Sequence, residues 1–166
     1  MSNFTGSGWS FGTTPNASGC DAGTAACWVI VDVNGTFNNA GGNAGATRPF
    51  LLSEYSTTIS NAHQLQLMSL NLGASYTLGR DIDLGPALSA ASGMWSPAGF
   101  VPIGNATASF EAITGGTPFT GTFDGLNRNL SNLAIARSTI HYGCRGAWLP
   151  CTWPSSPRRP WRYMAD

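Results

Sequence analysis

The sequence predicts an all-β fold of the solenoid type, with one short helix and an irregular C-terminal tail. Only 10% of the residues are charged and 21 are glycine, a composition typical of β proteins with many tight turns. Residues 130–135 change period at Asn132, as expected if one residue in the left-handed conformation turns a corner between two short strands. Short strands joined by such corners are what a solenoid coil requires.

The charge balance excludes several classes of protein. The eight basic residues are all arginine and are matched by eight acidic residues, so the net charge is zero. A coiled coil or a charge-rich disordered chain needs more charges, and a nucleic-acid partner needs a basic stripe. No apolar run approaches the roughly 20 residues that span a bilayer, and no export signal opens the chain. The signal of an exported protein is therefore expected on a part upstream.

The first region, residues 1–47, is expected to contain short strands and loops rich in glycine, serine and asparagine. Within it, the β-branched run 28–33 predicts a strand. Asn34 and Gly35 then predict a turn, because both residues tolerate a positive φ. Residues 38–47 are predicted to form a loop.

One helix is predicted, and it is expected to begin at Ser60, a favoured N-cap residue. Leu65, Met68 and Leu72 recur at helical spacing and predict its buried face. Gly73 is a natural stop for this helix, since glycine readily takes the conformation that ends one.

The segment 76–84 alternates, but it cannot keep one register throughout. Leu78, Arg80 and Ile82 would otherwise share one face, and a charged arginine does not belong in the core with the other two. The register is therefore expected to change near Gly79, as at a bulge.

Several segments occur in an order that is specific when they are taken together. Following the helix after Ser60, they are 74–84, Trp95, 99–104, 119–125 and 130–135. In this order they resemble the repeated module of filamentous-haemagglutinin-like exoproteins and other large bacterial adhesins that contain GLUG repeats. The resemblance covers about residues 48–137 and implies a right-handed parallel β-helix, or solenoid, in this region.

The resemblance also implies a function. The chain would be a structural and binding module of a large secreted surface adhesin, not an enzyme, truncated and inactive alone. Through the parent protein its partners would be a receptor or glycan on a host-cell or bacterial surface, and an outer-membrane transporter for export. The expected location is extracellular, at the bacterial cell surface. The alternative is a β-helix polysaccharide-degrading enzyme or an accessory module of a secreted peptidase.

The chain departs from the family pattern at three places. Residues 126–128 lack the glycine that usually follows the Asp-Gly turn, although Asn127 can still adopt a positive φ. Extra residues lie between Ile103 and Phe119, where an outward loop is expected. The family continues with further coils after Ile135, and this chain does not.

Residues 138–166 have a different composition from the rest. They contain four prolines, three of the six tryptophans and no asparagine. Repeated proline breaks both helices and strand ladders, so this tail is predicted to be unstructured. Our hypothesis is that it is translated out of frame, and the alternative is a genuine short basic and aromatic tail. No metal site is predicted from His141, Cys144 and Cys151.

Three carboxylates, Asp81, Asp83 and Asp124, are the one acidic group to consider for chemistry. On a parallel β-helix, such residues could bind Ca²⁺ or act as acid and base. The favoured interpretation is that Asp81 and Asp83 cap turns or face solvent, and that Asp124 forms an Asx-turn. His63 is expected at the surface or at its boundary, because no nucleophile or second metal ligand is spaced to meet it. No catalytic, cofactor-binding or metal-ligating residue is predicted.

Cys20 and Cys27 are the candidate disulfide, since they flank a small loop rich in glycine and alanine. Closing this loop would stabilise the fold by roughly 2.5 kcal/mol in the chain-entropy model. The alternative is two unrelated thiols. A zinc site is not expected, because the spacing of the cysteines is too long and both histidines are distant in sequence.

Overall fold

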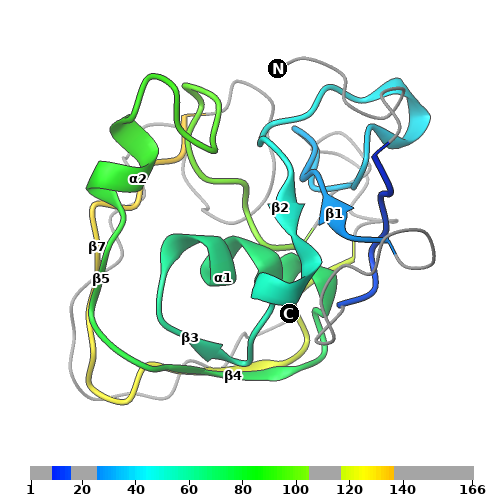
Figure 1. Ribbon diagram of the computed structural model, residues 1–166. Coiled ribbons are helices and arrows are strands. Elements are labelled where there is room, and N and C mark those ends of the chain that lie inside the picture. The colour runs from blue at the N-terminus through cyan, green and yellow to red at the C-terminus, as the bar shows by residue number, and fades with distance from the viewer. Residues whose placement is uncertain (1–8, 16–25, 105–116, 137–166) are drawn as a thin grey trace, which may run out of the picture.

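The computed structural model describes residues 9–15, 26–104 and 117–136 (Figure 1). Its strands and its helical segments are both short. The strands are β1 (Trp28–Val29), β2 (Phe50–Leu51), β3 (Thr58–Ile59), β4 (Ser75–Leu78), β5 (Ile82–Asp83), β6 (Thr122–Asp124) and β7 (Leu130–Ser131). The α-helices are α1 (Ala62–Leu67) and α2 (Gly85–Ser89), and the 3₁₀-helices are η1 (Ala40–Gly42), η2 (Leu52–Glu54) and η3 (Met68–Leu70). None of the helices in this part of the chain is long and apolar enough to cross a membrane.

The strands form three separate sheets in the described residues. β1 and β2 pair antiparallel, while β3, β4 and β6 form a parallel sheet in that order. β5 and β7 form a second parallel pair, and Figure 1 shows these two strands side by side, away from β1 and β2. The register places Tyr76 opposite Phe123 and Ile82 opposite Leu130.

The prediction of a right-handed parallel β-helix is wrong. A β-helix requires each coil to bond to the coil before it and the coil after it along every strand. Among the described strands only β4 has a partner on both edges, and the first sheet is antiparallel. The fold is instead a small mixed one, with sheets of two or three strands and short helices. The alternative of a polysaccharide-degrading enzyme was based on the same scaffold, and its β-helix is therefore corrected as well.

The predicted helix exists, but both of its ends differ from the prediction. Asn61, not Ser60, is the N-cap, and its side chain accepts a hydrogen bond from the Gln64 N–H at 2.9 Å. The side chain of Gln64 in turn accepts from the Ser60 N–H at 2.8 Å. Side chains therefore satisfy one backbone N–H within the first turn and one just before it. α1 ends at Leu67 and continues as the 3₁₀-helix η3, so it stops before Gly73.

Helix α1 lies near the centre of the molecule in Figure 1 and carries much of the core. The predicted inward residues Leu65 and Met68 are buried. They belong to a single cluster that also contains Phe50 of β2, Tyr76 of β4 and Trp95. The core is thus assembled from segments that do not repeat one another, which is the physical reason that no regular coil results.

The backbone corners agree with the sequence analysis. Asn132 has φ 55° and Asn127 has φ 58°, both in the left-handed region predicted for them. Gly35 has φ 82° in the predicted turn. Leu126 also has a positive φ, of 46°, a conformation that costs a residue with a β-carbon about 1 kcal/mol or more.

The register change near Gly79 is confirmed by the burial of its neighbours. Leu78 and Ile82 are both buried, whereas Arg80 between them is exposed. A β-carbon on Gly79 would lie 2.6 Å from Ser60 Oγ, so the chain passes too close to β3 for a larger residue. The close approach explains why glycine stands at this point.

The polar side chain of Gln66 on α1 is fully buried in the core. Its Oε1 accepts hydrogen bonds from Trp95 Nε1 and from the Val101 N–H, both at 3.0 Å. Its Nε2 donates to the Val101 carbonyl oxygen, also at 3.0 Å. Gln66 therefore ties the segment around residue 100, which has no regular secondary structure, to the central helix.

Candidate functional site

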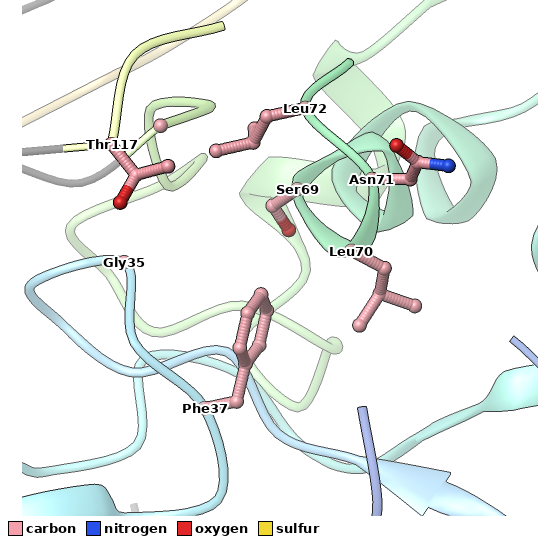
Figure 2. A pocket seen from close by; sticks show the side chains of 8 residues that line it. Gly35, Phe37, Ser69, Leu70, Asn71, Leu72 and Thr117 are labelled. Atoms are coloured by element: carbon pink, nitrogen blue, oxygen red, sulfur yellow. The ribbon is translucent and has the colours of Figure 1, made fainter. Parts of the chain in front are cut away.

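A pocket of about 320 Å³ lies where the loop after β1 meets the end of η3 (Figure 2). It is lined by residues without formal charge: Gly35, Phe37, Ser69, Leu70, Asn71, Leu72, Gly104 and Thr117. In Figure 2 the ring of Phe37 points into the space below Ser69, and the Asn71 carboxamide points away from it. The pocket thus offers an aromatic ring and aliphatic side chains with few polar groups.

Ser69 contributes a hydroxyl group to the lining of the pocket. It donates a hydrogen bond to the Gln66 carbonyl oxygen at 2.8 Å, so its oxygen remains able to accept one. The Asn71 Oδ1 accepts from the Gly73 N–H at 3.3 Å, which holds that side chain in the turn after η3. Among the described residues of the lining, the polar chemistry is therefore hydrogen bonding without an ionised group.

Phe37 is positioned by a loop that folds around the buried carboxylate of Asp32. Asp32 Oδ2 accepts from the Thr36 hydroxyl at 3.0 Å, and Oδ1 accepts from the Asn39 N–H at 3.0 Å. Burial raises the pKa of the Asp32 carboxyl, and these hydrogen bonds only partly oppose that effect. Asp32 was not predicted as a structural residue, although a carboxylate inside the otherwise apolar run 28–33 was a signal.

We predict that Asp32→Asn changes how stability depends on pH. Because the pKa of Asp32 in the folded chain is raised above the ordinary aspartate value of 3.8, the folded chain binds more protons just above that pH. Its contribution is therefore most favourable below pH 3.8 and is lost as the pH rises through the folded-state pKa. Urea unfolding of both proteins between pH 3 and 7 should show wild type losing stability relative to the variant as the pH rises. A difference that stays constant or grows with pH would contradict this cause.

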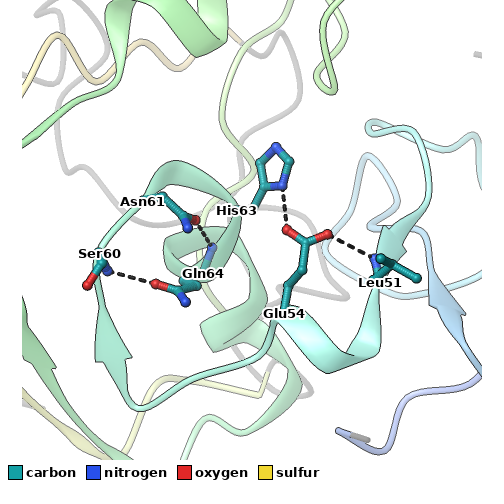
Figure 3. A network of polar contacts seen from close by, with 6 residues as sticks. All are labelled: Leu51, Glu54, Ser60, Asn61, His63 and Gln64. Carbon is teal, nitrogen blue, oxygen red and sulfur yellow. Dashed lines mark hydrogen bonds and ion pairs between the residues drawn. The ribbon is translucent and has the colours of Figure 1, made fainter. Parts of the chain in front are cut away.

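Glu54 and His63 of α1 form a hydrogen-bonded pair (Figure 3). His63 Nδ1 lies 2.6 Å from Glu54 Oε2, and the other carboxylate oxygen accepts from the Leu51 N–H at 3.3 Å. The imidazole packs edge-on against Phe50 and Trp95, with ring centroids 5.1 and 5.7 Å away. The pair fixes η2 and β2 against the helix.

The exposed fraction of the His63 side chain is 35%, in agreement with the expectation of a boundary histidine. A carboxylate that orients an imidazole is two thirds of a hydrolytic triad, but a nucleophile in reach is also required. In Figure 3 no hydroxyl is joined to the imidazole, and Ser60 lies on the far side of Gln64. Within the described ranges no three metal-binding side chains gather.

The carboxylates of Asp81 and Asp83 hold loops instead of meeting in a site. Asp81 Oδ1 accepts from the Asn129 N–H at 2.9 Å. Asp83 Oδ1 accepts from the Gly85 N–H at 2.9 Å and from Asn132 Nδ2 at 2.8 Å, which lowers the pKa of this carboxyl. Both residues therefore attach β7 and its corners to β5.

Asp124 accepts a hydrogen bond from the Leu126 N–H at 2.9 Å, which is the predicted Asx-turn. This bond helps the chain through the two positive-φ residues that follow. The side chain is exposed at the end of β6.

Cys27 is buried and disulfide-bonded. Its partner lies outside the described residues, as do Cys20, His141, Cys144, Cys151 and the whole tail 138–166. The pairing of Cys27 with Cys20 therefore stays a prediction.

No family model, curated protein or solved structure matches this chain. The candidate site consequently depends on the geometry of the pocket alone. Sequence reasoning missed the pocket, because its wall joins Phe37 to residues 69–72, more than thirty positions away. The one available signal of the pocket was Phe37, a single aromatic residue in an otherwise polar loop.

Proposed function

We propose that the chain is a non-catalytic binding module of a large exported surface protein of the adhesin type, contacting a receptor or glycan on a cell surface. The observation that carries the proposal is the uncharged pocket with the Phe37 ring in it. Aromatic rings pack well against the apolar face of a neutral sugar, and the Ser69 oxygen could accept a hydrogen bond from a sugar hydroxyl. An ionic substrate would find no charged partner in this lining.

The disulfide at Cys27 supports an extracellular location, since disulfides persist in oxidising compartments. The resemblance to GLUG-containing adhesins supports the same location and suggests a parent protein exported through an outer-membrane transporter. Export and attachment through the parent protein are both part of this proposal.

The test is binding of neutral oligosaccharides to the full chain, first on a glycan array and then by calorimetry with each sugar that binds. We expect Phe37→Ala to weaken binding at least tenfold, because it removes the ring that packs on the sugar. Trp9→Ala is the matched control, since Trp9 is an aromatic residue with an exposed fraction of 42% that does not line the pocket. Wild-type binding that survives Phe37→Ala, or is lost equally in both variants, would reject the pocket as the binding site.

A further inference from the structure

The last two strands of the described chain leave an open edge. β6 pairs only with β4, and β7 pairs only with β5, within the described residues. We call the outer side of β6 and β7 the open edge. Unpaired strand edges are templates for another strand, and proteins usually protect them.

The backbone groups that face outward at this edge follow from the ladder. In a parallel ladder, alternate residues bond to the same neighbour. The Ile82 N–H donates to the Asn129 carbonyl oxygen, and the Leu84 N–H donates to that of Ser131. Leu130 lies between these two acceptor residues on β7, so its own N–H and C=O point outward. On β4, the Thr77 N–H donates to the carbonyl oxygen of Thr57, just before β3. The backbone N–H and C=O of the neighbouring Tyr76 therefore point towards β6.

The same alternation then applies to β6. Tyr76 lies opposite Phe123, so the backbone hydrogen bonds of Tyr76 go to Thr122 and Asp124. The backbone N–H and C=O of Phe123 therefore point outward. The side chains of Phe123 and Leu130 are only partly buried while they pack against the core. Another strand at this edge would therefore gain hydrogen bonds and bury more apolar surface.

The opposite edge of the sheet that contains β6, formed by β3, is blocked. On the outer side of β3, the Thr58 N–H donates to Ser56 Oγ at 3.0 Å. The Ser60 N–H donates to Gln64 Oε1 at 2.8 Å. Side chains have thus taken the donors that a further strand would need, so copies of the chain cannot stack β6 onto β3 without breaking these bonds.

We propose that the open edge binds the open edge of a second copy of this chain, which gives a closed dimer and not a filament. A twofold contact uses the same surface on both copies, so the two open edges pair with each other and neither stays available to a third copy. The charges fit such a contact, because Asp124 and Arg128 are exposed at the two ends of the turn between the strands. Each copy thus presents one acid and one base, and a twofold axis can place each opposite its counterpart.

The experiment is sedimentation velocity of the oxidised full chain. Its concentration is varied from about 1 to about 100 µM, the range in which a weak dimer dissociates. We expect a concentration-dependent species of twice the 17.3 kDa of the chain. Thr122→Lys places an exposed lysine on β6 and should raise the dimer dissociation constant at least tenfold, since like charges then meet at the contact. Thr58→Lys makes the same change at an exposed threonine on the blocked edge and should leave the dimer unchanged.

Three outcomes would overturn the proposal. The first is a wild-type chain that stays monomeric at the highest concentration. The second is an open series of larger species that Thr58→Lys stops, because that would mean stacking through β3. The third is an equal effect of both variants on the dimer. Equal melting temperatures of the variants by circular dichroism establish that any change is one of association and not of folding.

Discussion

Gln66→Leu is expected to lower the free energy of unfolding by about 4 kcal/mol, since each buried polar group left without a partner costs about 1–3 kcal/mol. The substitution keeps the approximate volume of the side chain but removes both its acceptor and its donor. Trp95 Nε1 and both the N–H and the carbonyl oxygen of Val101 would then lose their partner inside the core. Urea unfolding followed by tryptophan fluorescence measures the loss.

Gln64→Leu is the matched control for this prediction. Gln64 lies on the same helix and is only partly buried, and its Oε1 accepts one hydrogen bond, from the Ser60 N–H. We expect this variant to lose about 1 kcal/mol, the usual contribution of one hydrogen bond at a helix start. Equal losses in the two variants would mean that the network around Gln66 does not hold the core together.

Local features of the fold were predictable because they depend on the conformation of a single residue. Asn132, Asn127 and Gly35 have the positive φ expected of them, and Gly79 marks the register change. The Asx-turn at Asp124 belongs to the same class, since its hydrogen bond spans two residues. In each of these cases the residue type restricts the backbone directly.

The arrangement of the strands was not predictable in this way. A short strand such as β3 or β7 has only two residues, and its partner is chosen by packing against distant segments. Leu130 pairs with Ile82, and Val101 bonds to Gln66 across 35 residues. A β-helix would have needed such pairings to repeat along the chain, and the core residues do not repeat.

The candidate site escaped prediction for a related reason. Its wall is made where the loop carrying Phe37 packs near the end of η3, and no motif links these two segments. Asp32 positions that loop through the Thr36 hydroxyl and the Asn39 N–H, a role that depends on burial more than on spacing. In contrast, the turn-holding roles of Asp83 and Asp124 were the favoured interpretation, because each hydrogen bond spans only two residues.

Cys27→Ser is expected to lower the free energy of unfolding by about 2–4 kcal/mol, the usual contribution of a native disulfide in a small domain. Cys27 is buried next to β1, and its carbonyl oxygen accepts from the Leu52 N–H at 2.8 Å, so the crosslink is attached to the core. Urea unfolding of the oxidised wild type and of the variant measures the loss. Reduction of the wild type should destabilise it by at least as much, because it breaks the same bond.

Cys20→Ser distinguishes the possible partners of Cys27. If the predicted pair exists, this variant loses the same free energy as Cys27→Ser, and digestion before Asp21 leaves two peptides joined through Cys20 and Cys27. A Cys20→Ser protein as stable as wild type would instead assign the partner to Cys144 or Cys151. Such a crosslink would connect residues 138–166 to the core, and it would contradict the hypothesis that this tail is translated out of frame.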